Sequence, residues 1–303
     1  MIRIVLAGQA VVLCVLALLA ADLYAHKRVE MVGGVNVWGY RGTVAKQRTA
    51  GDHRLLFVGG TRAYGYGATA DGTAAHALEW DLTADLRRPV TVINAAVMGA
   101  TASDFAAMVS RRLNLDPDTV CVYDDLGYAT TRPRDSRLAR AANGYTPVLP
   151  LVLEEKGMAW RFGSVEGGYA GAAPAGSLFR RAAGASLQRL GSTLRTIESP
   201  PVSATTPGYA SSMLAAVDAA LARAARVLVV VDPAHDQRTR GNLAALEEAI
   251  RARGDSRITL LPLSGVGGPD TLLDGYSYNA QGRARVALSL RAALRELLKS
   301  APP

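Results

Sequence analysis

The chain has 303 residues, of which 49% are apolar and 20% charged, so it is neither wholly disordered nor too short to bury a core. Its 34 basic and 26 acidic residues give a net charge of +8, and the four Phe and scattered arginines do not form the basic, aromatic groove that binds nucleic acid. The excess positive charge favours an anionic lipid surface or an acidic partner, although a solvated arginine-rich surface explains it equally well.

The N-terminal segment is apolar from Ile4 to Ala21 except for Gln9. A helix of this length extends roughly 27 Å, just enough to cross the hydrocarbon layer of a membrane. A cleavable signal peptide is the competing interpretation, but the best cleavage site, Leu23-Tyr24-Ala25, has leucine where a small residue is needed. We therefore expect residues 1–25 to be an uncleaved transmembrane anchor and residues 26–52 to be a linker.

Apolar strands alternate with amphipathic helices over residues 53–303. Strands are predicted at Arg54–Val58, Val90–Asn94, Thr119–Tyr123, Arg226–Val231 and Ile258–Leu263. Helices are predicted at Thr73–Leu86, from a Ser103 cap to about Leu113, and at Leu178–Ile197, Tyr209–Ala225, Leu243–Arg253 and about Ala280–Ser300. This alternation predicts an α/β fold with a parallel sheet covered on both faces, whose ligands would bind beyond the carboxyl ends of the strands.

Residues 129–175 interrupt this rhythm, because they are rich in Gly, Pro and Arg and lack a sustained period. We expect them to form an irregular insertion above the sheet. The two cysteines, Cys14 in the apolar segment and Cys121 in a core strand, cannot reach one another, and no metal-ligand spacing or phosphate-binding loop is present. The sequence therefore predicts neither a cofactor nor a metal.

The first strand runs into Phe57-Val58-Gly59-Gly60-Thr61-Arg62-Ala63-Tyr64-Gly65-Tyr66-Gly67. This segment resembles the opening block of the SGNH (GDSL-type) hydrolases, in which a strand runs into Gly-Gly-Ser or Gly-Asp-Ser and an aromatic-Gly turn. Three further segments resemble the remaining blocks in the family's order: residues 94–99, residues 117–123, and Asp274-Gly275-Tyr276-Ser277 with the following residues 279–282. The resemblance covers residues 54–300 and implies a flavodoxin-like, three-layer SGNH domain.

The residues that carry the family's chemistry are changed in this sequence. The resemblance places Thr61 at the nucleophile, Gly127 where an asparagine would help to hold the oxyanion, and Ser277 where the histidine base would stand; Gly99 and Asp274 match the family. Threonine is a crowded nucleophile, one lost oxyanion donor typically costs about 10²–10³ in rate, and serine cannot act as a base near neutral pH. We therefore expect no catalytic residues.

Four other residues at the strand ends are candidates for a pocket: Arg62, Asp124, Asp125 and His235. His235 follows the most apolar strand and is a candidate replacement base, although a loop histidine between two aspartates is more often solvated or capping. The Asp124–Asp125 pair is a candidate carboxylate or cation site, but turn capping or pairing with Arg62 or Arg132 is the simpler interpretation. Arg62 is a candidate anion site, with a plug-like salt bridge as the simpler alternative.

These observations predict a non-catalytic, membrane-anchored SGNH-like protein that serves as an accessory or scaffold subunit of a larger membrane complex, with membrane-protein partners along residues 4–21. The alternatives are a divergent envelope esterase that uses Thr61, and a ligand-binding module built on the former pocket. The basic residues that follow the anchor favour a cytoplasmic domain. The resemblance favours the extracytoplasmic side, and we expect a single-pass protein with its domain there.

Overall fold

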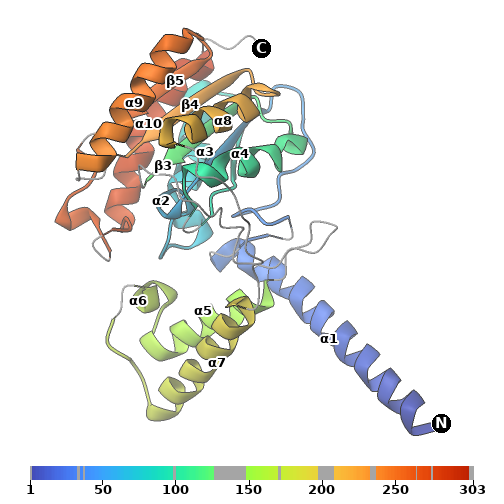
Figure 1. Cartoon of the computed structure of the whole chain (residues 1–303). Helices are drawn as coiled ribbons and strands as arrows, with labels where there is room; N and C mark the ends of the chain where they lie inside the picture. Colours follow the sequence, from blue (N-terminus) through green and yellow to red (C-terminus); the bar gives the residue numbers. More distant parts are fainter. Residues whose placement is uncertain are drawn as a thin grey trace.

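The computed structural model describes residues 2–32, 35–36, 38–97, 100–125, 148–169, 172–196, 208–232, 237–263, 265–273 and 276–299 (Figure 1). Its sheet has the order β2-β1-β3-β4-β5, and all four strand pairs are parallel. The strands are β1 (His53–Gly59), β2 (Val90–Asn94), β3 (Thr119–Asp124), β4 (Arg226–Val231) and β5 (Ile258–Pro262). This is the flavodoxin-like order, so the predicted α/β fold class is confirmed.

Two helical layers cover the sheet, because successive strand residues point to opposite faces. In β1, Leu55 and Phe57 pack with α3 (Ala74–Leu86) and α10 (Ala280–Lys299). Leu56 and Val58 pack instead with α4 (Ala102–Ser110), α8 (Tyr209–Leu221) and α9 (Gln237–Arg253). All four of these β1 side chains are fully buried. The result is the predicted three-layer sandwich.

Helix α4 begins two residues before its predicted start. Thr101, not Ser103, precedes the helix, and it forms a capping box with Asp104, whose Oδ2 accepts the Thr101 backbone N–H at 2.8 Å. Ser103 lies inside the first turn, where its hydroxyl contacts that of Thr101 at 2.9 Å. Serine and threonine are both good caps, so local sequence does not distinguish the two positions.

The prediction of an irregular insertion over residues 129–175 is wrong for the part of it that the structure describes. Residues Leu149–Phe162 form α5 and Val165–Tyr169 form the short α6. Helix α5 packs lengthwise on α7 (Leu178–Thr196), and the three helices lie together outside the three-layer sandwich (Figure 1). Residues 126–147 lie outside the described part of the chain.

The segment predicted to be a linker is not free of the domain. Helix α1 (Ile2–Val32) extends into it, and of the residues that follow, Asn36, Tyr40 and Arg41 are buried. The Arg41 guanidinium donates to the Tyr64 backbone oxygen at 2.9 Å, and its backbone N–H donates to the Asn94 oxygen at 2.8 Å. Residues 35–52 are therefore part of the folded domain.

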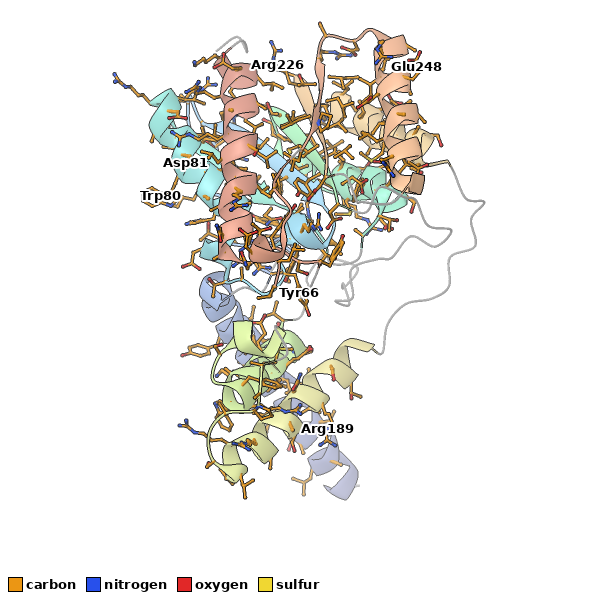
Figure 2. All side chains as sticks on the ribbon, turned by 90° about the vertical axis from the view of Figure 1, so that its left-hand side faces the viewer. Tyr66, Trp80, Asp81, Arg189, Arg226 and Glu248 are labelled. Carbon is orange, nitrogen blue, oxygen red and sulfur yellow. The ribbon has the colours of Figure 1, made fainter. Side chains whose placement is uncertain are left out.

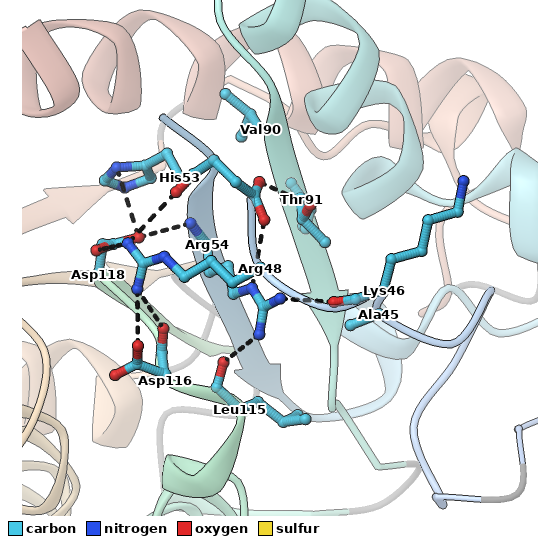
Figure 3. Close-up of polar contacts among 12 residues, drawn as sticks. Ala45, Lys46, Arg48, His53, Arg54, Val90, Thr91, Leu115, Asp116 and Asp118 are labelled. Carbon is cyan, nitrogen blue, oxygen red and sulfur yellow. Dashed lines mark hydrogen bonds and ion pairs between the residues drawn. The ribbon is translucent and has the colours of Figure 1, made fainter. Parts of the chain in front are cut away.

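The end of this segment is tied to the amino ends of β1 and β3 (Figure 3). Arg48 donates to the carboxylates of Asp116 and Asp118 at 2.8 and 2.6 Å, and Asp118 also accepts the Arg54 backbone N–H at 2.8 Å. His53 lies in the same cluster, where burial lowers its pKa. The sequence correctly places this histidine at the end of the sheet opposite the candidate site.

The outer edge of β2 is capped by side chains and by the segment before β1. Thr83 Oγ1 accepts the N–H of Val90 at 3.2 Å, and Glu79 accepts the N–H of Val92 at 2.8 Å. Arg41 pairs with Asn94 at the end of the strand. Because these backbone N–H groups already have acceptors, the edge of β2 does not offer them for pairing with a strand of another chain.

One helix in the described part of the chain, α1, is long and apolar enough to cross a membrane, over Leu6–Ala25. The carboxyl-terminal end of this span packs against the rest of the protein, because Asp22 and Ala25 are buried. The Asp22 carboxylate accepts the backbone N–H groups of Val148 and Leu149 at 2.9 and 2.6 Å, which caps the start of α5. The α5–α7 hairpin therefore begins directly on the candidate membrane helix.

Candidate functional site

The candidate site lies at the carboxyl ends of the central strands. The chain passes from β1 out to β2 and returns to β3 on the other side of β1, and ligands of open α/β sheets bind at such a reversal. Thr61 and Arg62 follow β1, Asp124 and Asp125 come at the end of β3, and Asp232 follows β4. The segment 276–278, just before α10, closes over the same edge, as its contacts with Arg62 show.

The turn between β1 and α2 (Thr61–Tyr64) is held by Asp125. Its Oδ2 accepts the Arg62 backbone N–H at 2.6 Å, so this carboxylate satisfies a donor in the first turn of the helix. A side chain at Gly60 would collide with Asp125 Oδ1 and crowd the Ala100 oxygen, which explains the glycine there. Asp125 therefore caps the turn between β1 and α2, rather than the turn that follows it in sequence.

Asp125 is fully buried, and its Oδ1 has no hydrogen-bond partner within the part of the chain that the structure describes. The pKa of Asp125 is raised to about 7, chiefly by burial and also by the nearby charge of Asp124, although the N–H of Arg62 stabilises the ionised form and opposes the shift. Tyr276 completes the surroundings by donating its hydroxyl to the Asp125 backbone oxygen at 3.1 Å.

The Arg62 guanidinium lies across the strand ends. Its Nη1 contacts Asp232 Oδ2 at 2.6 Å, and its Nε donates to the Tyr276 backbone oxygen at 2.9 Å. The guanidinium carbon also lies 4.6 Å from the ring centres of both Tyr276 and Tyr278. Only 12% of the Arg62 side chain is exposed, so it fills this edge as a salt-bridged plug.

Asp232 is the centre of this cluster, because one of its oxygens receives three donors. Besides Arg62, the hydroxyls of Tyr123 and Tyr278 donate to Oδ2 at 2.9 and 2.7 Å. Burial and then the charge of Asp232 raise the pKa of both tyrosines, so the hydroxyls stay protonated as donors. Burial is the largest single influence on the pKa of Arg62 and would lower it, but the charge and hydrogen bond of Asp232 together with the two tyrosines outweigh burial, so the pKa is raised.

Asp124 does not join Asp125 in a carboxylate pair. It points to the opposite face of the sheet, where its Oδ2 accepts the Tyr209 hydroxyl at 2.7 Å, and it is fully buried. Among the described residues no cluster of three His, Cys, Asp or Glu could hold a metal ion. The geometry of the described residues therefore does not support a joint cation site at Asp124 and Asp125.

The positions predicted from the family resemblance are only partly described. Thr61 is half-buried at the start of α2, and Ser277 is buried between Tyr276 and Tyr278. Gly99, Gly127, His235 and Asp274 lie outside the described residues, as does Arg132. The predicted loss of the catalytic set therefore stays a prediction.

A threonine hydroxyl needs a base to act as a nucleophile. The histidines whose side chains the structure describes lie elsewhere: His53 begins β1 at its amino end, and His76 lies on α3. Asp125 has a pKa suited to proton transfer, but one oxygen already accepts the Arg62 N–H. The chemistry that the described residues support here is charge pairing and hydrogen bonding within the protein.

A groove of about 500 Å³ lies away from this edge, between residues 41–46, α3 and β2. His76 and Glu79 line it together with Lys46 and Asp71. Burial raises the pKa of Glu79, whose carboxylate caps the Val92 N–H. Sequence reasoning did not anticipate this groove, because its walls come from segments that are separated along the chain.

The residues that sequence reasoning missed at the site itself are Asp232, Tyr123 and Tyr278. Asp232 directly follows the most apolar strand and so stands at the carboxyl edge by position alone, which was the available signal. Tyr123 ends the third strand in the same way. Tyr278 carried no signal of this kind, because it follows no strand.

Comparison with known proteins finds similarity only to solved structures, at low sequence identity. No family profile matches the sequence, and no curated protein matches it. Among solved structures, TesA is 16% identical with a TM-score of 0.43, over 81% of this chain and 99% of that one. A putative lipolytic protein of the G-D-S-L family from Desulfitobacterium hafniense is 11% identical with a TM-score of 0.41, over 79% and 98% of the two chains.

An acetyl xylan esterase from Butyrivibrio proteoclasticus is 10% identical with a TM-score of 0.42, over 84% of this chain and 66% of that one. Likenesses of this strength carry no argument about the reaction. By the order and parallel register of its own strands and by its two covering layers, the chain has a flavodoxin-like, three-layer α/β fold, and this fold is preceded by one helix that is long and apolar enough to cross a membrane.

Proposed function

We propose that this protein is a membrane-anchored, SGNH-like pseudoenzyme that serves as an accessory or scaffold subunit of a membrane complex. The observation that carries the proposal is the position of Arg62. Its guanidinium occupies the edge of the sheet next to Thr61, bonded to Asp232 and stacked on two tyrosine rings. The ion pair therefore occupies space at the carboxyl edge of the sheet, where ligands of this fold class bind, and a ligand that took its place would have to displace it.

The cost of that displacement supports the proposal. Leaving one member of a buried ion pair without its partner typically costs about 3–5 kcal/mol. An esterase, by contrast, uses its binding energy to stabilise the transition state. The hydrogen-bond donors of its site are arranged to bind the charge that develops there, and are not occupied by other side chains. A fold whose site is filled by its own bonded side chains is suited to a structural role.

Retention of the anchor is the second part of the proposal. Asp22 and Ala25, which would flank a signal-peptide cleavage site, are buried in the folded protein, and Asp22 caps α5. Removing the segment would expose the N–H groups of that helix. We place the domain on the extracytoplasmic side, as a single-pass membrane protein with partners along residues 4–21.

The absence of hydrolase chemistry is tested with the full-length protein in mild detergent. We expect p-nitrophenyl acetate hydrolysis no faster than in a protein-free blank, and no labelling by a fluorophosphonate. Thr61→Ser removes the crowding methyl and is expected to stay inactive, because the hydroxyl still lacks a base. Labelling of the wild-type protein at residue 61 that disappears in Thr61→Ala would instead establish the alternative, a divergent esterase.

The subunit role is tested by purifying the protein from native membranes in a mild detergent. We expect integral-membrane partners in fixed stoichiometry, and we expect them to be lost when Gly8 and Gln9 are replaced by leucine, because small and polar residues mediate contacts between membrane helices. Val11→Leu in the same helix is the matched control. Recovery of the wild-type protein as a monomer without partners would contradict this role.

A further inference from the structure

The α5–α7 hairpin is the part of the described chain that the proposed function does not explain. It starts at Asp22, at the end of the candidate membrane span, where the carboxylate caps α5. Figures 1 and 2 both show the hairpin and α1 on the same side of the α/β domain. In both views α7 begins at the end of the hairpin farthest from that domain. If α1 crosses a membrane, the hairpin faces the membrane surface.

The two long helices of the hairpin pack through glycines. A side chain at Gly157 would collide with backbone atoms of Gly184 and Gln188, and one at Gly191 would collide with the Pro150 oxygen. Backbones in such close contact leave little room for apolar side chains between the helices. Small residues at a helix interface are also characteristic of packing in membranes, where the apolar side chains face lipid.

The apolar side chains of the hairpin are correspondingly exposed. At the start of α7, 82% of Leu178 and 78% of Phe179 are accessible, and about half of Trp160 and Leu190. Leu178 and Phe179 are adjacent in sequence and form the beginning of a helix. Two large side chains in this position favour insertion into an apolar phase over contact with water.

The charge of α7 has one sign. Leu178–Thr196 contains four arginines and no Asp or Glu, and the exposed Arg180, Arg181 and Arg189 have no acidic partner among the described residues. Figure 2 shows Arg189 on the hairpin, away from the α/β domain. Several arginines of the α/β domain, by contrast, pair with acids, as Arg291 does with Asp85 at 2.6 Å.

We infer that the α5–α7 hairpin is a second membrane element, which lies on an anionic lipid surface beside α1. Leu178 and Phe179 enter the apolar layer, and Arg180, Arg181 and Arg189 bind headgroup phosphates. An amphipathic helix that combines exposed Leu and Phe side chains with arginines and has no acidic residue is typical of helices that lie in the membrane interface. Each arginine near such a surface contributes roughly fivefold in affinity. This inference depends on the membrane anchoring in the proposed function, but not on the absence of catalysis.

The test places a fluorescent probe on the full-length protein in vesicles. Phe179→Cys in a Cys14→Ser background is labelled with a nitrobenzoxadiazole dye; the remaining Cys121 is fully buried. The matched control is Trp80→Cys, an exposed position on α3 of the α/β domain (Figure 2). Vesicles are made of phosphatidylcholine alone or mixed with phosphatidylglycerol, each with or without a spin-labelled quenching lipid.

With phosphatidylglycerol present, we expect the probe at position 179 to become several-fold brighter and to be quenched by the spin-labelled lipid, while the probe at position 80 changes little. The double substitution Arg180→Glu with Arg181→Glu is expected to abolish the difference between the two lipid mixtures. A water-exposed probe at 179 in both mixtures, or a protected probe that the lipid quencher does not reach, would overturn the inference. Carbonate extraction of the same samples separates this result from a failure of α1 to insert, which would overturn the proposed anchor instead.

Discussion

Replacing Asp232 with alanine is expected to lower the free energy of unfolding of the α/β domain by about 3–5 kcal/mol. The Asp232 side chain is only 7% exposed, and it accepts Arg62, Tyr123 and Tyr278 on one oxygen. Its removal leaves a guanidinium with its charge unpaired in a site that is 88% shielded from water, together with two hydroxyls that have lost an acceptor. Few single substitutions in this domain would remove so many contacts at once.

The matched comparison is the double variant Arg62→Met with Asp232→Leu, which removes both charges and keeps the apolar volume. Because replacing a whole buried ion pair is often neutral, we expect the double variant to regain most of the stability that Asp232→Ala loses. Denaturant unfolding of the full-length protein in mild detergent measures both. A single variant that costs less than about 1 kcal/mol would show that the plug contributes little to stability.

The plug also bears on the ligand-binding alternative for this edge of the sheet. A ligand anion would have to compete with Asp232 for Arg62, at a distance of 2.6 Å and with two tyrosines already arranged around the pair. The variant Asp232→Ala would free that position. A protein that bound anions only after this substitution would indicate an ancestral pocket now closed by its own carboxylate.

The fold could be predicted from sequence because its signals are local. A run such as Arg226–Val231 is apolar enough to indicate a buried parallel strand by itself, and the order of such runs fixes the layers. Side-chain partners are not local. A salt-bridged plug at Arg62 can be expected from sequence, but its partner Asp232 lies far away in the chain. Only the pairing of β1 with β3 and of β3 with β4 brings the two together.

Helix α5 shows the opposite situation: its sequence gives no clear helical period, whereas its partner α7 is predicted from sequence. The usual apolar stripe marks the face that packs on a neighbour. In α5 that face carries Gly157, while the large apolar side chain of Trp160 is about half exposed. A pattern that assumes burial of the large side chains therefore predicts an irregular segment over 149–162.

Asp125 gives the second large effect on stability, and the size of this effect depends on pH. Burial raises its folded-state pKa to about 7, from the ordinary value of 3.8 expected in the unfolded chain. Between these two values the folded protein holds a proton that the unfolded protein has lost, so this group's contribution to stability falls as the pH rises from about 4 to 7. The total is of the order of 4 kcal/mol, from about 1.4 kcal/mol for each pH unit.

Asp125→Asn removes this titration and keeps an oxygen that can accept the Arg62 N–H. We expect the variant to be close to wild type in stability at pH 4, to gain on it steadily up to pH 7, and to keep a constant advantage above that. Glu248→Gln, which removes a carboxylate that is 70% exposed, controls for the loss of one negative charge. A stability difference between Asp125→Asn and wild type that stays flat from pH 4 to 8 would mean that Asp125 is already ionised in the folded protein. Oδ1 of Asp125 has no hydrogen-bond partner among the described residues and would then need one. The surroundings of Gly60 would in that case be more polar than the described contacts of Asp125 indicate.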